Sequence, residues 1–150
     1  MFNLFLALHV LAAILAIGPL VHTATTAGRG VRTGDGAATA ASARMARIYA
    51  YVSLAVVVLG FGLMSMKDPD PPHLKAGQFG DTWIWLSLVL WAAAMALVLG
   101  VVVPTLNKAT QLIAKQESVV ALTARVAAAG GSVGLLFAVI VFLMVYRPGS

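Results

Sequence analysis

Four runs of about 20 mainly apolar residues, at about 2–24, 47–66, 83–106 and 126–146, occupy most of this 150-residue sequence. About 20 such residues are needed for a helix to cross the hydrocarbon core of a bilayer. Since lipid offers the backbone no hydrogen-bond partners, each run is predicted to be helical. Short connections favour antiparallel neighbours. The predicted fold is therefore all-α, a four-transmembrane-helix antiparallel bundle with up-down-up-down topology, in a single integral membrane domain over 1–150.

The composition supports a membrane location. Hydrophobic residues make up 61% of the chain and charged residues 10%, against about 45–50% and about 25% in soluble domains. A chain of this length cannot bury so much apolar surface in its own core. This excludes a soluble enzyme, a disordered tail and, despite the net charge of +5, a nucleic-acid-binding module. The expected partner is membrane lipid. The absence of cysteine excludes disulfides and thiolate metal sites.

The connections between the runs differ in kind. Residues 25–37 are rich in Gly and Thr, which predicts a loop, with the second helix starting at about Ala38. Residues 67–81 contain three prolines and cannot be helical throughout, and Asp81 is a plausible N-cap for the third helix. Residues 107–118 are polar but lack helix breakers, which predicts a helical extension followed by a short turn.

Lysine and arginine predict the orientation, because both gather on the cytoplasmic side of a membrane. Seven flank the first and third connections: Arg29, Arg32, Arg44, Arg47, Lys108, Lys115 and Arg125. Three lie at the other end: Lys67, Lys75 and Arg147. Both termini are therefore predicted to face outward from a bacterial cytoplasmic (inner) membrane. The first residues carry no Lys or Arg, unlike a secretory signal peptide, so the first run is interpreted as a retained helix.

Small residues indicate where helices approach closely. Gly130 and Gly134 form a GxxxG motif in the fourth run, and the third run carries Ala92, Ala96 and Gly100 at spacing four. Such stripes let helix backbones meet in lipid. Such stripes are compatible with contacts between helices of one bundle and also with contacts between subunits of a homo-oligomer.

Two prolines lie inside runs, Pro19 in the first and Pro104 in the third. Each removes a helix hydrogen bond. Both are predicted in the inner third of the bilayer. Two kinks at this level would splay the bundle. The alternative is that each proline makes a simple bend and that neighbouring groups satisfy the freed backbone carbonyl.

Few polar residues lie within the runs. None of the runs has Asp, Glu or Lys at mid-depth, which counts against a proton-coupled transporter and against most hydrolases. The segment Asp68-Pro-Asp70-Pro-Pro-His73 is interpreted as a solvated loop, with a metal site as the alternative.

His9 is the most informative residue, because it lies about 10 Å inside the first run. The same depth falls near Gly60 on the second run and Ser87 on the third. A neutral imidazole there can bind a metal ion or a haem iron, and Gly60 and Gly62 would leave room for a flat ring. The alternative is a buried histidine hydrogen-bonded to Ser87 or to a carbonyl.

A second group lies near the inner face: His22, Arg44, Arg47, Arg125, Thr105 and Asn107. These residues could hold haem propionates, lipid phosphate or another anion. The alternative is that the arginines extend to headgroups as topology anchors. His22 lies about 20 Å from His9 along the helix, and the two imidazoles point to roughly opposite faces. They cannot bind the same iron within one chain. A second iron ligand would therefore come from a partner chain, Met64 or Met144.

Two segments resemble known proteins. The stretch from Leu8 to Gly18 resembles the first helix of small four-helix bacterial membrane proteins of the copper-resistance D type and the HemJ-type protoporphyrinogen oxidases, and the stretch from Leu143 to Pro148 resembles the end of their last helix. The resemblance implies that His9 matches a first-helix histidine associated with haem b in the HemJ type, and that Arg125 matches a basic residue before the last helix. Residues 83–87 lack the lysine of the HemJ pattern, so the uncharacterised relatives of these families match best.

Three functions remain open at this point, and whether the protein is an enzyme is open with them. The first is a membrane protein that binds haem b or a metal ion through His9. The second is a non-catalytic protein, such as an accessory subunit, an assembly factor or a homo-oligomer. The third is a small-solute channel or carrier that uses the level of Pro19 and Pro104.

Overall fold

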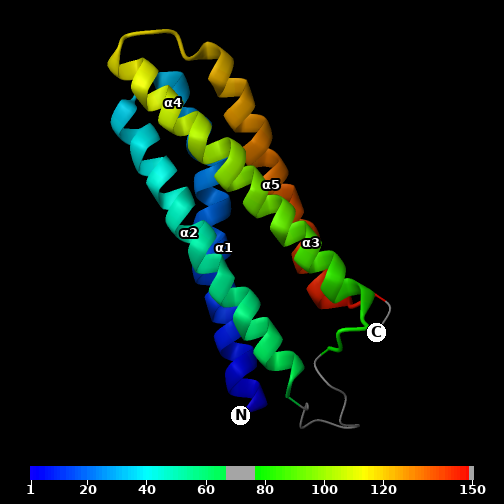
Figure 1. Cartoon of the computed structure of the whole chain (residues 1–150). Coiled ribbons are helices and arrows are strands. Elements are labelled where there is room, and N and C mark those ends of the chain that lie inside the picture. Colours follow the sequence, from blue (N-terminus) through cyan, green and yellow to red (C-terminus); the bar gives the residue numbers. More distant parts are fainter. Residues whose placement is uncertain (67–76, 149–150) are drawn as a thin grey trace.

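The computed structural model describes residues 1–66 and 77–148, which form helices and no strand. The elements are α1 (Phe2–Thr33), α2 (Gly36–Met64), α3 (Thr82–Leu97), the π-helix η1 (Val98–Val102), α4 (Val103–Ala114) and α5 (Val120–Tyr146). Because α3, η1 and α4 form one continuous rod, four rods cross the molecule, each long and apolar enough to span a membrane. Figure 1 shows both chain ends at one end of the bundle. The predicted all-α four-helix architecture is confirmed.

We call the end of the bundle that holds both termini the terminal end. The opposite end carries the α1–α2 and α4–α5 connections and is called the basic end. Because α1 has 32 residues, it is about 48 Å long, whereas a hydrocarbon core is about 30 Å thick. The basic residues of α1 and α2 all lie toward the basic end. We therefore expect the excess length to lie in the headgroup layer at the basic end.

The predicted loop at 25–37 is wrong, because α1 continues to Thr33 and α2 begins at Gly36. Threonines in the last turns of α1 donate their hydroxyls to carbonyls of the preceding turn, which suits a helix. The turn itself needs only two residues. Gly34 takes a left-handed backbone (φ 65°) that ends α1, and the Asp35 carboxylate accepts from the Ala38 N–H and starts α2.

The other connections follow the prediction more closely. The expected helical extension exists, since α4 runs to Ala114, but α5 begins at Val120, before the predicted span. Asp81 occupies the N-cap position of α3, yet its carboxylate accepts from the Gln78 N–H at 2.7 Å rather than from the first turn of the helix. The segment with Asp68, Asp70 and His73 lies outside the described residues.

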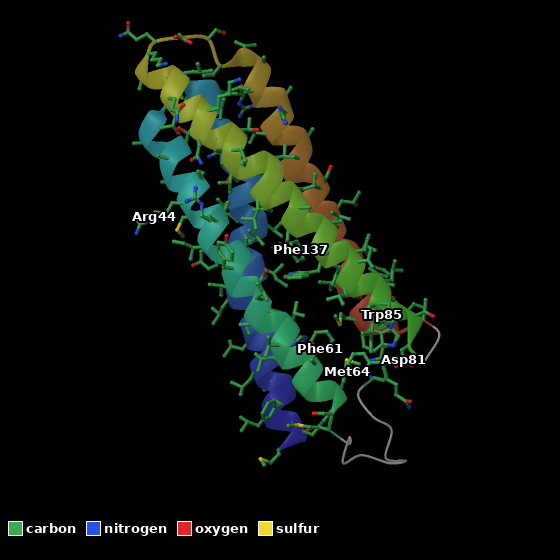
Figure 2. The ribbon with its side chains drawn as sticks, viewed as in Figure 1. Arg44, Phe61, Met64, Asp81, Trp85 and Phe137 are labelled. Atoms are coloured by element: carbon green, nitrogen blue, oxygen red, sulfur yellow. The ribbon has the colours of Figure 1, made fainter. Side chains whose placement is uncertain are left out.

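The helices pack in two pairs that are joined at the basic half. α1 packs along α2 and α5, α2 packs on α4, and α3 packs on α5. Toward the terminal end, the α1–α2 pair and the α3–α5 pair diverge (Figure 1). Buried side chains from all four rods meet nearer the middle and the basic end, among them Leu20, Ala50, Val98 and Val133. Figure 2 shows Phe137 of α5 between the two pairs, where it is buried.

The GxxxG motif lies in the α1–α5 interface. A Cβ atom on Gly130 would overlap the carbonyl group of Ala24, and one on Gly134 would contact the Thr25 methyl group. These glycines therefore pack within one bundle, as the first of the two sequence alternatives expects. The stripe Ala92, Ala96 and Gly100 is exposed on the α3–η1 segment.

The two prolines act differently. Pro19 lies inside an unbroken α1, whereas Pro104 is the second residue of α4, one residue after the π-helix η1, which accommodates the missing backbone hydrogen bond. Leu20 and Val98 belong to one buried cluster, so Pro19 and η1 lie near the same level. The helix pairs diverge on the terminal side of this level. Leu20, Val98 and Val102 are fully buried here, which argues against an open path for a solute.

The α1–α5 contact gives a first prediction. Gly130→Ala should destabilise the bundle by about 1–3 kcal/mol, because the new methyl group must push α1 and α5 apart. Gly131→Ala is the matched control, since a Cβ there meets nothing within 4 Å. Unfolding in mild detergent measures both variants. Equal stability of the two variants would contradict the close contact.

Candidate functional site

A small polar cluster joins the two helix pairs at mid-depth. The Trp91 indole N–H on α3 donates to Ser53 Oγ on α2 at 3.1 Å. Ser53 is fully buried, donates to the Ala50 carbonyl at 2.6 Å and lies 3.4 Å from the Met95 sulfur. We call this contact the Trp91 tie. The sequence analysis missed it, although a lone serine and a lone tryptophan at mid-span were its visible signal.

A second side-chain contact joins the pairs near the terminal end. The rings of Phe61 on α2 and Phe79, before α3, stack with centroids 5.9 Å apart and planes inclined by 22°. The part of the α2–α3 interface between this stack and the Trp91 tie is called the terminal seam. Along α2 it runs from Ser53 to Phe61, which is about 12 Å. α3 packs on α5 rather than closely along α2, so side chains hold this seam together.

His9 lies over the α2 side of the terminal seam. Its half-buried ring faces Gly60, where a Cβ would lie 3.2 Å from His9 Cε1. The ring is also close to the Val56 backbone carbonyl. Nδ1 is buried without a hydrogen-bond partner. The predicted proximity of His9 and Gly60 is therefore present, and the space above the glycine is filled by the imidazole itself.

Two more buried polar atoms without partners lie in the first turns of α3, between Phe79 and Trp91. They are Ser87 Oγ and Trp83 Nε1, in residues 4% and 6% exposed. The Trp83 ring lies against Gly77 and under the Arg147 guanidinium, whose carbon is 5.8 Å from the ring centroid. Among the described residues, only these two atoms and His9 Nδ1 are buried side-chain N or O atoms without a partner. No hydrogen bond joins His9 and Ser87, whereas the Val56 carbonyl, which represents the other predicted kind of partner, lies at the His9 ring.

The described residues do not form a cradle for a porphyrin at this position. Gly60 is covered by His9, and Gly62 faces the ring of Phe5. Of the methionines considered as second iron ligands, Met64 is half-buried and Met144 is exposed. Residues 1–66 and 77–148 contain no group of three His, Cys, Asp or Glu side chains able to hold a metal ion.

The basic group predicted near the inner face does not converge. His22 on α1, Arg44 and Arg47 on α2, and Arg125 on α5 are all exposed. No hydrogen bond or ion pair joins these four side chains. Arg44 points away from the bundle (Figure 2). This arrangement favours side chains that extend separately to lipid headgroups around the bundle. It does not favour a closed pocket for one anion.

Comparison with known proteins identifies the family. Residues 3–148 match the family described as "Predicted integral membrane protein (DUF2269)". The chain belongs to this family. No protein of curated function and no solved structure matches it significantly. The resemblance to uncharacterised four-helix membrane proteins is therefore supported in its general form. The specific relation to the copper-resistance D and HemJ types stays a prediction.

The Trp91 tie of this DUF2269 protein gives a second prediction. Ser53→Ala leaves the Trp91 indole N–H without its partner in an apolar interior, which should cost about 1–3 kcal/mol. Ser132→Ala is the control, because the Ser132 hydroxyl bonds only to the carbonyl of its own helix at Ala128. Stability in detergent and the tryptophan emission maximum are the measurements. An unchanged Ser53→Ala protein would show that the tie contributes nothing.

Proposed function

We propose that this integral membrane protein binds a small ligand from the lipid phase, with His9 as the anchoring residue in the terminal half of the bundle. The observation that carries the proposal is the buried His9 Nδ1, which has no hydrogen-bond partner; the other buried side-chain N or O atoms without a partner among the described residues, Trp83 Nε1 and Ser87 Oγ, also lie in the terminal half. Leaving such an atom unpaired costs about 1–3 kcal/mol. A ligand that pairs with these atoms would offset that cost.

Haem b and a metal ion are the ligands that the sequence suggests for His9. An imidazole nitrogen suits either one chemically. A porphyrin at Gly60 and Gly62 would first have to displace the side chains of His9 and Phe5. A metal ion would have His9 as its single imidazole ligand within the seam. The geometry therefore favours a ligand held by hydrogen bonds and apolar contacts.

A second candidate function is that of a non-catalytic subunit of a homo-oligomer or a larger membrane complex. The observation in its favour is the stripe of Ala92, Ala96 and Gly100, which the described part of the chain leaves exposed, with nothing within 4 Å of a Cβ on Gly100. Small residues at such spacing allow close helix contact in lipid.

The His9 proposal is tested by what the protein retains when it is purified from haem-replete cells. An absorption spectrum, metal analysis and mass spectrometry of a solvent extract identify bound molecules. We expect His9→Ala to lose a component that wild type retains, and His22→Ala, which changes an exposed imidazole, to keep it. If His9→Ala and wild type retain the same components, the His9 proposal is wrong.

We also propose that the basic end faces the cytoplasm, with both termini outside, in a bacterial cytoplasmic membrane. The distribution of Lys and Arg supports this orientation. The chain has no cysteine, so single-cysteine variants report cleanly. An impermeant maleimide added to intact spheroplasts should label Gln78→Cys at the terminal end and spare Glu117→Cys at the basic end. The reverse pattern would overturn the orientation.

A further inference from the structure

An open groove of about 450 Å³ lies between the end of α1 and the start of α5, at the basic end of the bundle. We call it the α1–α5 groove. Val31 and Arg32 line it on the α1 side, and the α5 side is lined by residues on one helix face, among them Val120, Thr123, Ala124 and Ala127.

The groove lies where α1 and α5 separate. At Gly130 the α5 backbone is so close to Ala24 that a Cβ atom would overlap its carbonyl group. One turn nearer the basic end, a Cβ atom on Gly28 would lie 3.9 Å from Ala127 Cβ, an ordinary contact distance. The space between the two helices therefore widens toward the basic end, and the groove fills the wider part.

The groove crosses the level at which the hydrocarbon of the bilayer ends. Ala127 lies at the start of the apolar run of α5, and Val120 lies about 10 Å beyond it along the helix. The headgroup layer on each side of a bilayer is about 5–8 Å thick. Val120, which is 78% exposed, therefore presents an apolar side chain at headgroup level. The acyl chains of surrounding lipids end below this level and leave the apolar lining uncovered.

The charges around the groove favour an anion. Arg32 is exposed, and no carboxylate of the described residues forms an ion pair with it. The connections at the basic end contain two acidic residues, Asp35 and Glu117, against the seven basic residues of this end, and the Asp35 carboxylate is occupied at the start of α2. A guanidinium binds phosphate through paired hydrogen bonds, while its aliphatic stem lies on apolar surface.

Thr123 adds a polar group to the lining. Its hydroxyl lies 3.5 Å from the Val119 carbonyl, at the outer limit of a hydrogen bond, so it can donate to a stronger acceptor such as a phosphate oxygen. Thr123 also lies in the first turn of α5, whose N-cap residue Val119 makes no side-chain hydrogen bond to the helix. The helix dipole favours negative charge at this position.

We propose that the α1–α5 groove binds one anionic phospholipid. Arg32 pairs with the phosphodiester and Thr123 donates to it, while one acyl chain begins between Val31 and Ala124 and passes Ala127 into the bilayer. A zwitterionic headgroup fits less well, because its amine would lie among the excess basic residues. The groove is about 34 Å from His9 along α1, so this proposal is independent of the His9 proposal.

The test is native mass spectrometry of the full chain in mild detergent, titrated with phosphatidylglycerol or with phosphatidylcholine of the same acyl chains. We expect one phosphatidylglycerol to bind about fivefold more tightly, the preference that one basic side chain gives for an anionic lipid. Arg32→Gln should abolish this preference, and Arg44→Gln, which changes an exposed arginine on α2, should keep it.

A second variant tests the groove itself. Ala124→Phe fills the groove while Arg32 is retained, and it should weaken phosphatidylglycerol binding at least fivefold. Ala124→Leu serves the same purpose if circular dichroism shows that the phenylalanine variant loses helicity.

Three outcomes would overturn the proposal. Equal binding of the two lipids, or equal losses in Arg32→Gln and Arg44→Gln, would show a general attraction of lipid to the basic end. Binding of phosphatidylglycerol that is unchanged by filling the groove would place the lipid elsewhere. If filling the groove instead breaks a dimer whose stability does not depend on lipid, a second copy of the chain covers the groove.

Discussion

The close approach of α1 to α5 at Gly130 is the contact on which the rest of the bundle depends. Lipid is as apolar as the helix surfaces, so burial of apolar area does not hold helices together in a membrane. Contact between backbones does, and it requires a residue without a Cβ atom. At Gly130 the α5 backbone meets the Ala24 carbonyl, and because α1 also packs along α2, this contact joins the α1–α2 pair to α5.

The two halves of the molecule are consequently held by different interactions. In the basic half, small and buried residues bring all four rods together, including Ala27, Ala43 and Ala109. In the terminal half, the pairs diverge, and aromatic side chains bridge them through Trp91 and Phe61. Contacts between side chains adjust more readily than contacts between backbones. The half that can adapt to a ligand is therefore also the half that carries the unpaired polar atoms.

The structure changes the interpretation of His9 and Gly60. A histidine and a glycine at one depth suggest a cofactor and the room for it. In the structure, Gly60 provides room for the His9 ring, and Gly62 provides room for Phe5. The glycines are thus explained by α1–α2 packing. What this packing leaves unexplained is Nδ1, which remains without a partner together with Ser87 Oγ and Trp83 Nε1.

The sequence alone determined the four apolar rods, the common end of both termini and the shared depth of His9 and Gly60, because length, hydropathy and helix rise are local properties. The loop predicted at 25–37 was wrong because Gly and Thr residues are compatible with a loop and also with a helix. In α1, the threonine hydroxyls donate to carbonyls of the same helix. Only the tertiary structure decided that Gly130 meets Ala24, that Trp91 reaches Ser53, and that the two pairs diverge. These features depend on how each helix is rotated against its neighbours, and that rotation is set by packing between residues far apart in the chain.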